Sequence, residues 1–234
     1  MLWLKAWKEV RFRFALTVLL SIYIIALIIG WLPSELATNK WKNLKPAESA
    51  TKLWQIFVLV YGGVLLPISA KILAGAGINA QTSMGMSRGF HGSMGFLLSM
   101  PVSRTRILAT RAGAGVILML IVSLASYAVA VAMVRDVTTP WAFFPNILIV
   151  ASFFYAMAVW LSTIFDEFWA GTIGLLMLGA LGGYSSSLPG TWLDLASYLL
   201  SPTPLIPAAQ TSFLLILTAL QLAAAIWIVE NKEY

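Results

Sequence analysis

The chain has no cysteine, a single histidine and few charged residues. The missing cysteines exclude disulfides, thiolate metal sites and thiol catalysis, and one histidine cannot supply an HExxH metal motif. Charged residues make up only 10% of the 234 residues, against 60% hydrophobic residues, and the mean hydropathy is +0.87. No water-facing surface can be kept polar with this composition. We therefore expect an all-α, polytopic membrane protein forming one domain over residues 1–234.

Several enzyme and carrier classes lack their necessary residues. The stretch Gly183-Tyr-Ser-Ser-Ser is not a GxSxG elbow and the sequence has no P-loop. Asp166 and Asp194 are expected on opposite sides of the membrane, where they cannot form a catalytic dyad. All nine acidic residues fall at the ends of apolar segments or between them, which argues against an ion-coupled carrier or channel. We predict a chain that is not itself an enzyme, with no cofactor and no metal ion of its own.

Six apolar stretches are long enough to cross a bilayer as helices, which need about 20 residues. The fourth and fifth are separated only by Asp166 and Glu167, so an unbroken pair of shorter turns is the alternative there. The expected spans are 14–32, 53–70, 112–134, 144–165, 168–187 and 211–229.

The distribution of lysine and arginine predicts the orientation, because basic residues resist translocation. With both termini in the cytoplasm, ten basic residues lie inside and five outside, which favours this orientation. Because no soluble domain is expected that could carry a basic face, the net charge of +6 is interpreted as a topology signal and not as nucleic-acid binding. The four lysines of the first outer loop weaken this argument. The inside set is Lys5, Lys8, Arg11, Arg13, Lys71, Arg88, Arg104, Arg106, Arg111 and Lys232, and the outside set is Lys40, Lys42, Lys45, Lys52 and Arg135.

Two segments outside the spans have unusual composition. In residues 1–13, Trp3, Trp7 and Val10 recur at helical spacing with charges on other faces, which predicts an interfacial elbow helix before the first span; a frayed tail is the alternative. Residues 188–210 carry three prolines after residue 200 and are too polar to cross yet too apolar for a solvated loop. They predict a re-entrant extracytoplasmic hairpin, with a loop packed over the spans as the alternative.

Residues 71–111 form the one long loop expected in the cytoplasm. Its second half contains "SMGFLLSMP", an apolar run that ends at Pro101 and predicts a short helix. Apolar side chains at Phe96, Leu97 and Leu98 would be exposed to water unless a partner covered them. Ser103 can then cap the following helix. We therefore expect this loop to dock a soluble protein.

The segment "GSMGFLLSMPVSRTRILATR", Gly92 to Arg111, resembles the Gly-Thr-x-x-x-Leu-Leu-Ser-x-Pro-Val-Ser-Arg segment between the second and third spans in permeases of the type-2 ABC exporter family. Specific similarity covers some twenty residues, whereas the layout agrees over the whole chain. Family members usually carry Glu shortly before the glycine, where this chain has Arg88 and His91; a solvated loop residue is the simpler interpretation of His91. The pattern positions and their neighbours are Gly92, Ser93, Phe96, Leu97, Leu98, Ser99, Pro101, Val102, Ser103 and Arg104.

The resemblance implies a multi-pass permease subunit of the cell membrane, in an ATP-driven exporter. It implies partners: two cytoplasmic ABC ATPase subunits that bind ATP and Mg²⁺, and a second permease copy or paralogue. Independently of the resemblance, basic residues at the membrane boundary commonly bind lipid headgroups, and we expect this role for Arg106 and Arg111 more than for Arg104. Gly92 and Phe96 to Arg104 would then form the ATPase-docking, coupling element. The alternative function is a non-transporting membrane anchor or assembly component that docks a soluble partner.

Overall fold

The computed structural model describes residues 2–36, 46–78, 103–134, 140–164, 194–201 and 208–231. These residues form helices and no strand, as the composition predicts. The elements are α1 (Leu2–Leu36), α2 (Pro46–Val60), the π-helix η1 (Tyr61–Leu65), α3 (Leu66–Ile78), α5 (Arg104–Met133), the 3₁₀ helix η2 (Pro140–Phe143), α6 (Phe144–Ile164), α8 (Leu195–Leu200) and α9 (Ala208–Asn231).

Five helical segments in the described part of the chain are long and apolar enough to cross a bilayer. Five of the six expected spans are therefore confirmed as membrane-length apolar helices. The remaining expected span, 168–187, lies outside the described residues. The five segments are Val10–Gly30, Ala50–Ala74, Leu108–Met133, Trp141–Ile164 and Ala208–Asn231.

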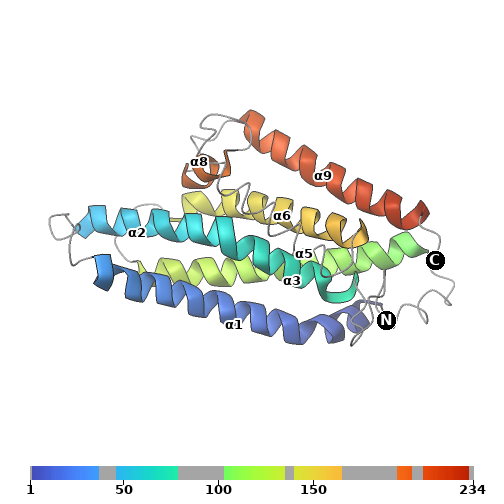
Figure 1. Cartoon of the computed structure of the whole chain (residues 1–234), viewed down its shortest axis with the longest axis horizontal. Coiled ribbons are helices and arrows are strands. Elements are labelled where there is room, and N and C mark those ends of the chain that lie inside the picture. Colours follow the sequence, from blue (N-terminus) through green and yellow to red (C-terminus); the bar gives the residue numbers. More distant parts are fainter. Residues whose placement is uncertain are drawn as a thin grey trace.

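The long helices lie roughly side by side along one axis (Figure 1). α1 and α5 start at the same end and run in the same direction, whereas α2 with α3, α6 and α9 run in the opposite direction. The start of α1 and the end of α9 consequently lie at one end of the molecule. α6 also finishes there, whereas the start of α2 lies at the opposite end, and α8 lies on the side of the bundle beside the start of α6.

α6 occupies the centre of the bundle. It packs against α3 on one side and α9 on the other, and further contacts join it to α5 and α8. Most of its side chains are buried, including an unbroken run from Phe153 to Val159. α1 and α9 lie at the periphery and expose large apolar side chains such as Phe12 and Trp227, as expected of helices that face lipid tails.

The second span contains a π-helix in its middle, η1, between α2 and α3. Its last turn is closed by the N–H of Leu66, which donates to the carbonyl oxygen of Tyr61, five residues earlier. Pro67 follows directly, and proline has no N–H to continue an α-helical pattern. The insertion rotates α3 relative to α2.

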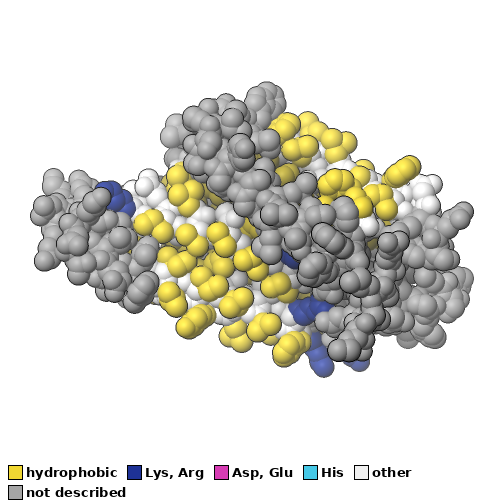
Figure 2. Space-filling model, viewed as in Figure 1, with side chains coloured by type: hydrophobic (Ala, Val, Ile, Leu, Met, Phe, Trp, Pro, Cys, Tyr) yellow, Lys and Arg dark blue, Asp and Glu magenta, His cyan; other side chains and the backbone are white. Residues whose placement is uncertain are grey.

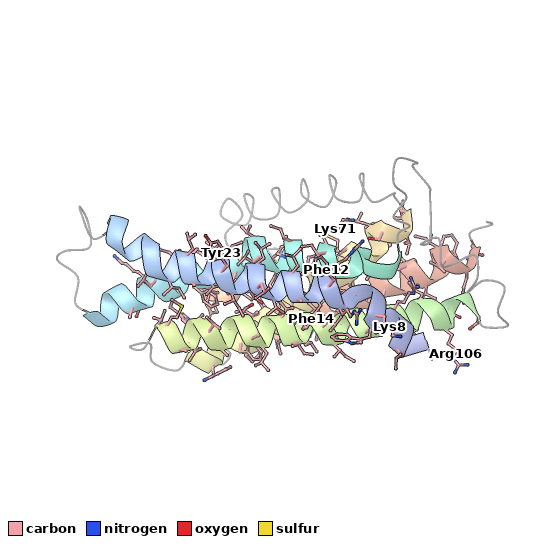
Figure 3. All side chains as sticks on the ribbon, turned by 90° about the horizontal axis from the view of Figure 1, so that it is seen from below. Lys8, Phe12, Phe14, Tyr23, Lys71 and Arg106 are labelled. Atoms are coloured by element: carbon pink, nitrogen blue, oxygen red, sulfur yellow. The ribbon has the colours of Figure 1, made fainter. Side chains whose placement is uncertain are left out.

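The expected elbow over residues 1–13 is helical from Leu2, but α1 is one element that continues into the first span. In Figure 3 the start of α1, around Lys8, bends away from the axis of the rest. Trp7 and Phe14 lie on the same side of α1, with ring centroids 5.8 Å apart. The secondary structure therefore shows no boundary between an interfacial helix and the first span. Only the prediction that residues 2–13 are helical is confirmed.

Candidate functional site

The predicted docking segment reaches the described structure at its last two positions, Ser103 and Arg104. Gly92, Phe96, Leu97, Leu98, Ser99, Pro101 and Val102 lie outside the described residues. Ser103 has an extended backbone conformation (φ −61°, ψ 142°) and precedes the first residue of α5. Its Oγ accepts a hydrogen bond from the Arg106 N–H at 3.4 Å, so the predicted N-cap is confirmed.

Basic side chains gather where α1 and α5 begin and α3 ends. Lys8, Arg11 and Arg106 are exposed there, and Arg111 is only 8% exposed. Figure 2 shows dark-blue basic side chains beside an apolar band at this end of the molecule, with a further basic group near the other end. Figure 3 shows Lys8, Lys71 and Arg106 in the same half of the bundle. The six basic residues of this end whose side chains are described are Lys8, Arg11, Arg13, Lys71, Arg106 and Arg111.

α5 connects the predicted docking segment to the core of the bundle. It is a single helix of 30 residues that packs extensively on α1 and also contacts α3 and α6. Near its start, the Tyr155 hydroxyl of α6 donates to the Ala112 carbonyl oxygen at 3.1 Å. Gly115 makes this contact possible, because a Cβ at that position would overlap the Tyr155 hydroxyl. A displacement at Ser103 would therefore be transmitted along a rigid helix to both α1 and α6.

The opposite end of the bundle is organised around Asn146 in the first turn of α6. Its Nδ2 donates to the carbonyl oxygens of Tyr198 at 2.9 Å and Ser201 at 2.6 Å. Asn146 therefore binds the end of α8 to α6, although sequence analysis gave this residue no role. In the sequence, Asn146 differs from its neighbours only as an amide side chain between Phe144 and an apolar run.

α8 also has its own cap and a contact to α9. The Asp194 carboxylate accepts from the Ser197 N–H at 3.0 Å, and the Tyr198 hydroxyl lies 3.1 Å from Thr211 Oγ1. Burial raises the pKa of the Tyr198 phenol above its ordinary value. The hydrogen bonds and the cap together fix α8 against both neighbouring helices.

Leu199 of α8 lies against Gly62 in η1, where a Cβ would overlap the Leu199 side chain. Gly62 is close to the middle of the Ala50–Ala74 span. By contrast, a Cβ at the neighbouring Gly63 would meet no atom within 4 Å. The two adjacent glycines therefore differ in role. The absence of a side chain at Gly62 leaves room for Leu199 of α8, whereas Gly63 has no neighbouring atom that a side chain would meet.

Aromatic side chains fill the space between α2, α5 and the start of α6. Phe57 and Tyr61 are stacked at 5.5 Å, and Trp54 meets Tyr127 edge-on at 5.3 Å. Tyr127 in turn lies 5.0 Å from Phe144. Aromatic pairs in these geometries stabilise packing beyond the area they bury, so this cluster joins three spans at their shared end.

Deeper in the bundle, the Tyr61 hydroxyl of η1 faces Ser123 and Ser126 of α5, and all three side chains are buried. No group of three or more His, Asp or Glu residues that could hold a metal ion occurs among the described residues.

A comparison with protein-family models finds no match to this chain. A comparison with curated proteins likewise finds no related sequence.

Proposed function

We propose that this chain is the transmembrane permease subunit of an ATP-driven ABC exporter. Gly92 to Arg104, which resembles the coupling segment of type-2 ABC exporter permeases, is the observation that carries the proposal. Its last serine caps α5, and α5 begins at the basic end of the bundle. The basic end is cytoplasmic under the proposal, because lysine and arginine are retained on that side.

The mechanism that we propose is mechanical coupling. Separate ATPase subunits, which supply the ATP and Mg²⁺ chemistry, dock on the apolar residues Phe96, Leu97 and Leu98. Their closure on ATP moves the segment, and α5 carries the motion to α1 and α6, with which it packs. A second permease copy or paralogue would complete the path for the cargo.

The proposal includes a re-entrant extracytoplasmic hairpin over 188–210. Two contacts support it: Leu199 reaches Gly62, near the middle of a span, and Asn146 binds α8 to the outer end of α6. Gly62 follows Ala50, the first residue of that span, by 12 residues, so Leu199 packs against the span well inside its start. The first turns of α1 would correspondingly form the elbow helix at the cytoplasmic interface.

Replacing both Leu97 and Leu98 by Asp tests the proposal. Burial of one leucine is worth about 1.5 to 3 kcal/mol, and a buried carboxylate adds a desolvation cost, so ATPase binding should fall by at least tenfold. The tagged chain is captured from its own cells in mild detergent, and co-purifying ATP hydrolysis is measured together with the P-loop content of the bound proteins.

Arg106→Ala is the control, because Arg106 is exposed at the start of α5 and should contribute little as a surface charge. Normal expression of the double Asp variant, with wild-type ATPase capture and turnover, would overturn the coupling role. Capture of a soluble partner without ATPase activity would support the membrane-anchor alternative instead.

A further inference from the structure

The start of α1 presents basic and apolar side chains next to one another on its exposed surface. Lys8 and Arg11 are exposed, and Phe12, Leu16 and Tyr23, which follow Lys8 at helical spacing, are 77%, 51% and 65% exposed. Figure 2 shows the apolar side chains as a yellow band that ends beside dark-blue groups. Cations therefore lie at one end of an exposed apolar face.

This face crosses the boundary of the membrane. The apolar span of α1 is Val10–Gly30, so Lys8 comes just before it and Arg11 is in its first turn. Trp7 is 46% exposed at the same level, and exposed tryptophan is typical of the headgroup region. Long basic side chains at such a boundary extend their charge toward the headgroups while their methylene groups cover apolar surface. Lys8 and Arg11 are thus placed at the depth of lipid phosphates.

α5 repeats this arrangement beside α1. The two helices pack against each other and run in the same direction (Figure 1). Arg106 is exposed just before the apolar span of α5, and Ile117 and Leu124 farther along are each 50% exposed, whereas Arg111 is only 8% exposed and adds little to this surface. Figure 3 shows Lys8 and Arg106 at the same end of the bundle. Two neighbouring helices therefore bring exposed cations to one membrane boundary.

α9 provides a contrast at the same end of the molecule. It too exposes apolar side chains, among them Leu220 (59%) and Trp227 (66%). Its 24 residues contain no lysine or arginine, and its one charged residue, Glu230, is exposed in its last turn. Lys232, beyond the helix, is followed directly by Glu233. Lipid tails suit both faces, whereas negatively charged headgroups suit the face on α1 and α5.

The charge at the start of α1 is not balanced by its neighbours. The first 13 residues contain four basic residues and one acidic residue, Glu9. The acidic residues with described side chains are Asp194 and Glu230, and neither belongs to α1 or α5. A soluble acidic protein would pair with the cations but not with the apolar face that continues into the membrane. A lipid with a negatively charged headgroup matches both parts.

We propose that the exposed face of α1 and α5 is a selective site for anionic phospholipids. The phosphate of the lipid contacts Lys8, Arg11 and Arg106, and its acyl chains lie along the apolar residues that follow on both helices. Each basic residue near the membrane surface strengthens the attraction of anionic lipids by roughly fivefold. The inference is independent of the transport proposal, because it rests on charge and exposure at the boundary of two spans and not on a partner ATPase.

Fluorescence quenching by brominated lipids tests this site. The chain has no cysteine, so Phe12→Cys and Trp227→Cys each carry a single bimane label, on the α1 face and on the α9 face. The labelled chains are reconstituted in a symmetric bilayer of phosphatidylglycerol and phosphatidylcholine in which one lipid or the other is brominated. Next to residue 12, phosphatidylglycerol should be enriched about fivefold or more over phosphatidylcholine. Next to residue 227, phosphatidylglycerol should not be enriched.

The enrichment should depend on charge. Lys8→Gln combined with Arg11→Gln should remove most of it, and about 1 M salt should do the same without any change of these residues, because salt screens exposed charges. Lys52→Gln is the matched control, since Lys52 is an exposed basic residue of α2 at the opposite end. Equal quenching by both lipids at residue 12 would overturn the proposal. Weak quenching by either lipid there would also overturn it, because a protein surface such as a second copy of the chain would then cover this face.

Discussion

At the residue scale, individual glycines decide how closely the helices approach. Gly115 faces the Tyr155 hydroxyl, and Gly62 faces the Leu199 side chain. Small residues commonly allow such approaches between membrane helices. The general packing role could be expected from the sequence. Which glycine meets which partner could not, because that depends on the rotation of each helix, and η1 changes this rotation in the middle of a span.

We expect Gly115→Ala to destabilise the chain, by roughly 1 to 3 kcal/mol, as is typical of overpacking. The added methyl overlaps a hydroxyl held on a rigid ring, and relief would break the hydrogen bond to Ala112. Thermal unfolding in detergent, followed by size-exclusion fluorescence, measures the effect. Gly30→Ala is the control, because its Cβ would meet nothing within 4 Å; equal Tm values for both variants would contradict the close contact.

Gly62→Ala should have a smaller effect than Gly115→Ala, because the overlapping atom is the flexible end of Leu199. The adjacent Gly63→Ala should leave stability unchanged or raise it slightly, since alanine favours helix over glycine by up to about 1 kcal/mol. The same thermal assay compares the two. A larger loss at Gly63 than at Gly62 would show that α8 does not pack here.

At the element scale, α8 is the clearest case of structure that the sequence only outlined. Its end at Leu200 agrees with the prolines that follow. Its attachment depends on Asn146, 52 residues before Tyr198, and nothing in the local pattern of either segment encodes that pair. By contrast, the Ser103 cap was predictable, because its partner is only three residues away.

Asn146→Leu should release α8. The change removes two hydrogen bonds and leaves two carbonyl oxygens unpaired, at a cost of about 1 kcal/mol if each bond has the average strength found within membranes. With Leu199→Cys as reporter in this cysteine-free chain, maleimide labelling of the buried position should become faster. Ser152→Ala on the same helix is the control, because Ser152 bonds only to its own helix at Leu148. Unchanged labelling in Asn146→Leu would contradict the anchoring role.

At the scale of the whole molecule, the spans were largely predictable and their packing was not. Long apolar runs set the number and extent of the helices, since a bilayer requires about 20 residues per crossing. The central position of α6 has no such signal, because lipid-facing and protein-facing surfaces are equally apolar. The candidate docking site was predictable only as a motif, and most of it lies beyond the described residues.

The two ends of α9 provide a matched test of orientation. Ala208 and Asn231 are both exposed and lie at opposite ends of one helix. In right-side-out vesicles, a membrane-impermeant maleimide should label Ala208→Cys at once and Asn231→Cys only after permeabilisation. The reverse pattern would place the basic end outside and contradict the cytoplasmic position of the docking segment.

The central position of α6 has a consequence for biosynthesis. α6 is enclosed by α3, which precedes it in the chain, and by α9, which follows it. Until α9 has been synthesised, the face of α6 that contacts α9 is without that neighbour, and before α8 is made Asn146 is without its partners there. An insertion chaperone or the translocon itself would have to shield that face until α9 is released. A chain truncated before residue 208 should therefore be inserted but rapidly degraded, whereas the full chain persists.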